Sequence, residues 1–168
     1  METTAVCGYK IRKITPADNA DIAALVRYNL KNHGLDIPGT AYFDPCLADL
    51  CAFYEGRDGC GYYVVTDAAG NVVGGIGFDR TTCVPDGAEL QKMYLADSAK
   101  GKGLSYVLIG FIEDRMRQAG IKTAYLETHS NLKTAIHVYE KCGYQRIPRP
   151  AQVEHSTMDH FFAKDLVE

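Results

Sequence analysis

The chain has 168 residues, the usual length of one globular domain. Hydrophobic residues make up 46% and charged residues 23%, so the composition argues against a disordered chain and against a disulfide-stapled miniprotein. The 18 basic and 21 acidic residues give a net charge of −3, which lacks the basic excess of proteins that neutralise nucleic-acid phosphates.

Hydropathy along the chain indicates a protein that does not enter a membrane. The apolar run at 106–112 is much shorter than the ~20 helical residues that span a bilayer. The opening METTAVCGYK has no basic segment followed by an apolar stretch, as a secretory signal would have. We therefore expect a cytoplasmic protein with neither a membrane nor a nucleic acid as partner.

The six cysteines predict neither disulfides nor a metal site. They form no CxxC pair and no Cys/His spacing typical of zinc ligands. Because a reducing cytosol keeps thiols free, we expect free cysteines and no bound metal.

The first half of the chain predicts a strand, two helices and a hairpin. Thr15 is an N-cap candidate with Pro16 in the first helical position, and Asp44 with Pro45 gives a similar start to the second helix. Apolar residues at helical spacing follow each start. The expected elements are a strand at 9–14, a helix from 16 to the stop at Gly34, a helix from 45 to the stop at Gly56, and hairpin strands at 62–66 and 72–78.

The second half predicts strands that alternate with two helices. No repeat, low-complexity tract or linker divides the chain, so we expect a single domain over 1–168. Strands mixed with crossover helices favour an α/β or α+β sheet sandwiched by helices. The expected elements are strands at 89–95, 122–128, 144–147 and 157–164, and helices at 101–119 and 131–142.

A glycine-rich turn, Lys100-Gly101-Lys102-Gly103, joins a strand to the long helix. Such a turn leaves backbone N–H groups free at the positive end of the helix dipole, where a phosphate can bind, although it can also be an ordinary solvated cap. The dinucleotide fingerprint fails because Tyr106 stands where its third glycine is needed, and the P-loop fails because Gly103 follows Lys102 where Ser or Thr is needed.

The stretch from 89 to 144 resembles the acyl-CoA-binding core of the GNAT N-acetyltransferase superfamily. The family signature, Arg or Gln, two residues, Gly, one residue, then Gly or Ala, falls here on Lys100, Gly103 and Ser105, so the first and last positions depart from it. Further matches follow at the family's spacing, at Asn131, Ala135, Tyr139 and the segment Lys141-Cys142-Gly143-Tyr144.

This resemblance implies a fold and an activity. The fold would be α/β (α+β), with a mixed, mostly antiparallel central sheet of about six to seven strands, flanked by about four helices and splayed at strands 4 and 5. The activity would be transfer of an acetyl group from acetyl-CoA to a primary amine by direct attack in a ternary complex.

The resemblance also implies which residues bind the cofactor. The main chain of Met93 and Leu95 would hold the pantetheine arm, backbone amides of the turn and helix start would hold the pyrophosphate, and Asn131 would contact the pantetheine. The complete implied set is Met93, Tyr94, Leu95, Lys100, Gly101, Lys102, Gly103, Leu104, Ser105, Tyr106 and Asn131.

Two catalytic residues are expected. Tyr139 would protonate the thioester sulfur, although a helix tyrosine is also a common core residue. An amine with a lysine-like pKa of ~10.4 must lose a proton before it attacks, and Glu89 is the candidate base because desolvation beside the cleft would raise its pKa. The alternative for Glu89 is a strand-end pair with Lys92; Glu127 and His129 are the other candidate bases.

The acceptor site is expected in the first two helices, their loop and the last strands. Arg27, Tyr28 and Tyr42 are the candidate substrate-binding residues, since Arg27 could bind a carboxylate and the tyrosines could line a pocket; a solvated helix face would also account for them. This set suggests a small amine, such as an amino acid. The alternatives are a protein or peptide acceptor and a non-catalytic acyl-CoA-binding sensory module, and exposed C-terminal strands are compatible with a homodimer.

Overall fold

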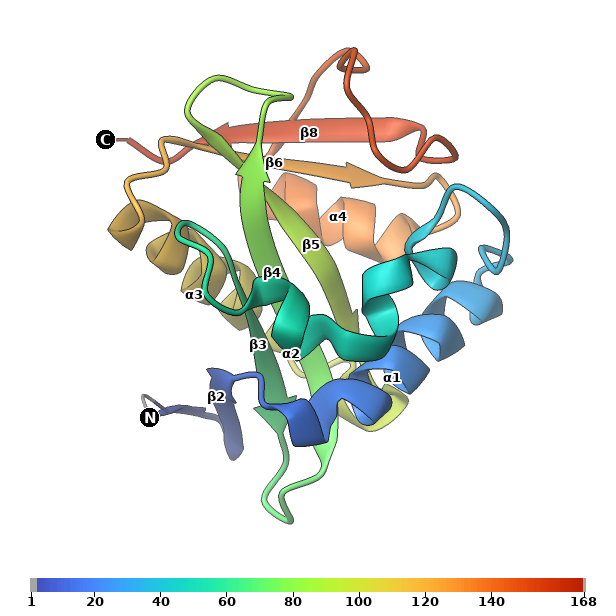
Figure 1. The fold of residues 1–168 in the computed structure, drawn as a ribbon, viewed down its shortest axis with the longest axis vertical. Helices are drawn as coiled ribbons and strands as arrows, with labels where there is room; N and C mark the ends of the chain where they lie inside the picture. Colours follow the sequence, from blue (N-terminus) through green and yellow to red (C-terminus); the bar gives the residue numbers. More distant parts are fainter. Residues whose placement is uncertain (1–2, 168) are drawn as a thin grey trace.

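The computed structural model describes residues 3–167, and over this range the chain forms one eight-stranded sheet with helices on both faces (Figure 1). Residues 1, 2 and 168 of the expected domain lie outside the described residues. The strands are β1 (Thr3–Val6), β2 (Tyr9–Lys13), β3 (Gly61–Thr66), β4 (Val72–Thr81), β5 (Gly87–Leu95), β6 (Thr123–Thr128), β7 (Gln145–Arg146) and β8 (His160–Asp165).

The sheet is mixed and mostly antiparallel, as expected. Its order is β1-β2-β3-β4-β5-β6-β8-β7, and β5–β6 is the parallel pair within the described range. The expectation of six to seven strands missed β1, which pairs with β2 across a tight turn at Cys7 and Gly8, both with positive φ. The last strand begins at His160 instead of 157, because the residues before it form a turn.

Four α-helices of the described chain flank the sheet, as expected: α1 (Asn19–Asn32), α2 (Leu50–Tyr54), α3 (Leu104–Gln118) and α4 (Lys133–Lys141). The second helix differs from its expected form, because a 3-10 segment, Pro45–Asp49, precedes a short α2. The start at Thr15 is held by Asp18, which accepts hydrogen bonds from the Thr15 amide at 2.8 Å and from Arg12 at 2.7 Å. All the helices of residues 3–167 are too short or too polar to cross a membrane.

Two apolar cores lie on opposite faces of the sheet. In Figure 1, α1 and α2 lie in front of the sheet and α3 and α4 behind it. The front core includes Ile22 and Leu30 of α1 together with Tyr54 of α2. The rear core includes Leu108 and Ile112 of α3, whose four-residue spacing places them on one helix face.

The parallel pair β5–β6 separates halfway along. Pairing between the two strands extends from Gly87↔Thr123 to Glu89↔Tyr125. Beyond this point β5 continues to Leu95 and β6 to Thr128 without pairing with each other. This is the expected splay, and it leaves the β6-facing backbone groups of the far half of β5 without a strand partner.

A bulge in β5 lies in this far half. Gly75 pairs with Tyr94 while Gly77 pairs with Gln91, so β5 holds an extra residue, and Lys92 adopts a positive φ of 48°. Tyr62 donates a hydrogen bond from its hydroxyl to the Lys92 carbonyl at 2.8 Å. Gly75 is required beside it, because a β-carbon there would lie 2.5 Å from the Tyr62 hydroxyl.

Candidate active site

A cavity of about 270 Å³ lies where β5 and β6 diverge. Its walls are residues 89–95 of β5, the end of β6, the C-terminal half of α1, one face of α4 and the start of the turn before α3. The cavity therefore meets the glycine-rich turn at one end and a cluster of charged side chains at the other.

The glycine-rich turn has the geometry that an anion needs. Gly101 and Gly103 have φ of 73° and 74°, and a β-carbon at either would meet no atom within 4 Å, so the backbone stands open. Gly103 is the N-cap of α3, whose first amides have no acceptor within the helix. The turn therefore fits the pyrophosphate of a CoA-type ligand.

The expected cofactor residues divide between the cavity wall and its surroundings. Those that line the cavity are Met93, Tyr94, Leu95, Lys100, Gly101 and Ser105. Leu104 is buried in the rear core, so its amide rather than its side chain is available to a ligand, whereas the side chain of Tyr106 is exposed. Lys102 lies against Tyr9, with 3.0 Å between its ammonium and the tyrosine hydroxyl, and Lys100 pairs with Asp97 at 2.8 Å.

Asn131 does not line the cavity but links two of the helices that do. Its side-chain amide donates to the carbonyl of His33 at 2.9 Å, which ties the start of α4 to the end of α1. Asn29 of α1 makes a second such link, donating to the carbonyl of Leu95 at 3.2 Å. The two amides fix α1 against β5 and α4.

Glu89 lies in the cavity wall at the last position of β5 that pairs with β6, and it is 8% exposed. Burial and the nearby carboxylate of Glu127 raise its pKa to about 7. Gln91 donates to Glu89 at 3.0 Å and is itself held by the Tyr54 hydroxyl at 2.5 Å. The alternative pairing of Glu89 with Lys92 is wrong, because Lys92 pairs with another residue, Asp44.

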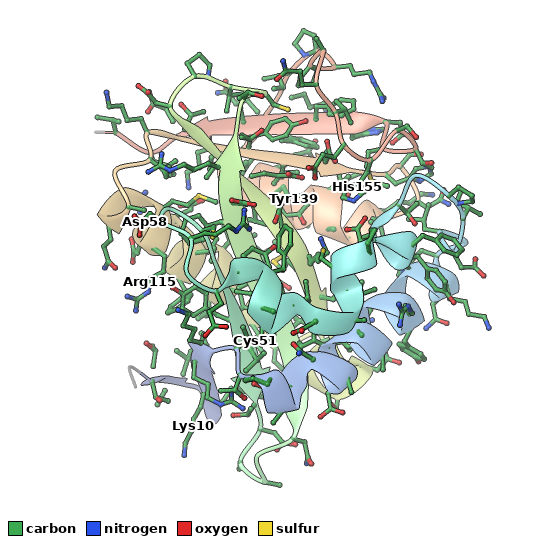
Figure 2. The ribbon with its side chains drawn as sticks, in the orientation of Figure 1. Lys10, Cys51, Asp58, Arg115, Tyr139 and His155 are labelled. Carbon is green, nitrogen blue, oxygen red and sulfur yellow. The ribbon has the colours of Figure 1, made fainter. Side chains whose placement is uncertain are left out.

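Tyr139 of α4 lines the same cavity and is 7% exposed. Burial raises the pKa of its hydroxyl well above the ordinary value, so the phenol keeps its proton over the physiological range. Its ring is positioned by Tyr144 and Phe162, with centroids 6.1 and 6.3 Å away. Figure 2 labels Tyr139 together with His155, another residue of the cavity wall, in the upper half of the molecule.

Four charged side chains, two of which lie close to Glu89, form what we call the imidazolium network; the sequence singled out Glu127 as a candidate base but did not connect the four with one another. They are Asp44, Lys92, Glu127 and His155. The two ring nitrogens of His155 lie 2.9 Å from Glu127 and 2.9 Å from Asp44, and Lys92 lies 2.8 Å from Asp44.

The imidazolium network fixes its own protonation states. Burial alone would lower the pKa of His155, but its hydrogen bonds to Asp44 and Glu127 outweigh burial and raise the pKa to about 10. Burial would raise the pKa of Asp44, but hydrogen bonds and charges from His155 and Lys92 lower it to about 2. At neutral pH His155 is therefore an imidazolium between two carboxylates.

Glu89, Glu127 and His155 offer ligand-type atoms that all lie within 4.8 Å of one another. A metal would need a lone pair on His155, but both ring nitrogens contact carboxylates. The arrangement suits proton-bearing groups better than a metal ion.

The expected acceptor residues lie outside the cavity wall. Tyr28 is 49% exposed and donates to Asp97 at 2.7 Å. Arg27 points to the carbonyl of Tyr42 at 3.5 Å, and the neighbour of Tyr42, Ala41, lines the cavity instead. The charged side chains of the cavity wall next to Glu89 are Glu127 and His155, and His155 contacts Asp44, which lies 111 positions away and was not connected with it from the sequence.

Comparison with known proteins agrees with this geometry. The model of the acetyltransferase (GNAT) family matches residues 27–144. Over 139 residues the chain is 38% identical to an uncharacterised N-acetyltransferase, YjgM, of Escherichia coli K12, and the match covers 82% of each protein.

Solved structures share the fold. A GNAT acetyltransferase from Staphylococcus aureus Mu50 superposes with a TM-score of 0.83 at 18% identity, covering 95% of this chain and 99% of that one. A spermidine N-acetyltransferase from Vibrio cholerae, in complex with CoA and spermine, gives 0.70 at 19% identity, covering 96% and 97%. With its family match over most of the sequence, this chain belongs to the GNAT family and is an acetyl-CoA-dependent acetyltransferase.

Proposed function

We propose that the protein transfers the acetyl group of acetyl-CoA to the primary amine of a small molecule, with Glu89 as base and Tyr139 as acid. The observation that carries this proposal is the shared cavity. A buried carboxyl group and a protonated phenol line one 270 Å³ space between the splayed strands.

The base is matched to its task. An aliphatic amine is mostly protonated at neutral pH, since its pKa is near ~10.4. A base works best when its own pKa lies close to the working pH, and burial together with Glu127 brings the pKa of Glu89 to about 7. Glu89 takes the proton from the amine, either directly or through one water, as the nitrogen attacks the acetyl carbon.

The acid has the complementary property. As the bond between the acetyl carbon and the sulfur breaks, the leaving sulfur needs a proton or a hydrogen bond. Tyr139 supplies one because burial keeps its hydroxyl protonated.

Acetyl-CoA supplies the activated thioester, and the chain binds it mainly through backbone. The open amides from Gly101 to Tyr106 hold the pyrophosphate, and the unpaired edge of β5 at Met93 and Leu95 holds the pantetheine arm. Lys100 and Lys102 add positive charge at this end.

A small cationic amine suits the acceptor end. The three cationic side chains in the cavity wall are each paired with a carboxylate: Lys92 with Asp44, Lys100 with Asp97, and His155 with Asp44 and Glu127. The carboxyl group of Glu89, which accepts a hydrogen bond from Gln91 and makes no ion pair among the described residues, remains to attract an ammonium group. An amino-acid acceptor would instead have to place its carboxylate near Arg27, outside the wall.

The test is mass-spectrometric detection of acetylated product from purified protein, acetyl-CoA and separate pools of amino acids, polyamines, aminoglycosides and short peptides. Direct detection avoids the background that six cysteines give with a thiol dye. We expect a product from a small-amine pool, and a much lower yield of the same product with Glu89→Gln under the same conditions. A product from the peptide pool alone would establish the peptide alternative. Binding of acetyl-CoA by calorimetry without any product would favour a sensory module.

A further inference from the structure

We propose that His155 is a positioning residue that fixes the carboxyl group of Glu127 and places a positive charge beside Glu89. The inference rests on the proposed function, because it assigns His155 a role only through the base Glu89.

Every hydrogen-bonding nitrogen of His155 contacts a carboxyl group. The Glu127 oxygen Oε1 receives two hydrogen bonds from this one residue, from Nδ1 at 2.9 Å and from the backbone amide at 3.2 Å. The other oxygen of Glu127 accepts from the Tyr125 hydroxyl at 3.2 Å. Nε2 of His155 meets both oxygens of Asp44, at 2.9 and 3.1 Å. Both ring nitrogens and the amide of His155 are therefore committed to carboxylates.

The imidazolium is needed because of the charges around it. Glu89 is buried and the side chain of Glu127 is only 3% exposed, with their oxygens within 4.8 Å of each other, and two such carboxyl groups cannot both ionise without a compensating cation. Lys92 does not provide that compensation directly, since it pairs with Asp44. His155 neutralises Glu127, so that Glu89 can lose its proton near neutral pH.

Several groups around Glu89 raise or lower its pKa, and a test of His155 must leave the other groups unchanged. Glu127 and Glu154 raise its pKa, whereas Gln91 and His155 lower it. The titratable groups around Glu89, from all the elements packed against it, are Tyr54, Asp79, Lys92, Tyr125, Glu127, Glu154 and His155.

Two variants should shift the titration of Glu89 in opposite directions. His155→Gln removes a positive charge that favours ionised Glu89, so the acidic limb of kcat/KM against pH should move to higher pH. Glu127→Gln removes a negative charge that disfavours it, so the limb should move to lower pH. A shift of one unit changes kcat/KM about tenfold on the acidic side of the inflection. A merely structural His155 would lower kcat/KM equally at every pH.

The control variant is His137→Gln. His137 is an exposed histidine of α4 that does not line the cavity, so its replacement removes an imidazole without touching the imidazolium network. Its pH profile should match that of the unmodified protein. If His155→Gln does not fold, His155→Asn replaces it, because the Asn amide keeps an N–H donor near the position of Nδ1 while the charge is lost.

A second readout needs no turnover. The side-chain carboxyl carbons of ¹³C-glutamate-labelled protein are titrated by NMR, with the Glu89 signal assigned by its loss in Glu89→Gln. A higher Glu89 midpoint in His155→Gln and a lower one in Glu127→Gln would support the proposal. An unchanged midpoint in His155→Gln would overturn it, whatever happens to activity. Shifted midpoints with unshifted rate profiles would overturn the base role of Glu89, and the catalytic role of His155 with it.

Discussion

Burial acts on Glu89 and Tyr139 through the same physics, with different chemical results. In both cases removal from water disfavours the charged form and raises the pKa. The carboxyl group thereby reaches a pKa of about 7 and can exchange a proton at working pH. The phenol moves further from neutrality and stays a donor. In the proposed mechanism, the same cavity supplies both a base and an acid.

Replacing Glu89 by Gln should remove the acidic limb of the rate profile. The amide keeps the size of the side chain but cannot take a proton, so kcat should fall by roughly 10²–10⁴-fold. The measurement is kcat/KM from pH 5.5 to 9 for both proteins. A variant that keeps an inflection near pH 7 would show that another group is the base.

Replacing Tyr139 by Phe should reduce activity without unfolding the protein. The ring contacts with Tyr144 and Phe162 remain, and only the hydroxyl is lost. We expect kcat to fall by no more than ~10²-fold, which is the low end of the usual effect of a general acid. The midpoint of thermal unfolding should stay the same. Full activity at every pH would refute the acid role.

At this scale the sequence could predict candidate residues that belong to one recognisable stretch of the chain. Glu89 and Tyr139 were identified because they accompany the motif-bearing stretch between 89 and 144. His155 could not be connected with Asp44, because only the closing of the sheet brings positions 111 apart in sequence to 2.9 Å. A pattern within one segment carries no signal of such a contact.

Among the elements, the turn before α3 has the clearest local origin. Glycine adopts a positive φ without the steric cost that a β-carbon brings, and Gly103 needs this conformation at the N-cap of α3. The same helix has a second glycine, Gly120, with an almost identical φ of 75° just past its other end. Comparing substitutions at these two glycines therefore distinguishes the effect of backbone strain from an effect on ligand binding.

Gly103→Ala should weaken acetyl-CoA binding, and Gly120→Ala should not. Both substitutions place a β-carbon at positive φ in open space, so each should cost about 1–2 kcal/mol of stability. Gly103→Ala also displaces the amides that face the pyrophosphate, and we expect at least a tenfold higher Kd by calorimetry. Equal affinities in the two variants would place the phosphate elsewhere.

Elements with strong periodicity or clear stop signals were predicted, and weakly marked ones were not. The long helix α3 and the hairpin β3–β4 appear close to their expected bounds. β1 was missed because its four residues are mostly exposed and show no apolar alternation. The bulge at Lys92 also has no local signal, since it depends on Tyr62 reaching across from β3.

For the whole molecule, the imidazolium network should make stability depend on pH. The pKa of His155 is raised to about 10, so its contribution is complete below its unfolded value of ~6.5 and is lost as the pH rises toward 10. The pKa of Asp44 is lowered to about 2, so its contribution is complete above ~3.8 and is lost as the pH falls toward 2.

His155→Gln should therefore matter most for stability at neutral and mildly acidic pH. Loss of one partner from a buried ion network costs about 3–5 kcal/mol, which lowers Tm by roughly 6–20 °C in a chain of this size. Thermal scans at pH 6 and pH 10 should show the gap between the two proteins narrowing at the higher pH. A gap that stays constant would show that His155 is neutral in the fold.

The parting of β5 from β6 leaves a cavity with two kinds of wall. The wall at the glycine-rich turn is mostly peptide backbone, which remains when side chains change. The wall at the imidazolium network is made of side chains from separate segments, the loop at Asp44, β5, β6 and the chain before β8. Under the proposed function, single substitutions can therefore alter the end of the cavity that receives the amine while the end that binds acetyl-CoA stays unchanged. A lineage built on this sheet can diverge in what it acetylates long before it loses the ability to acetylate.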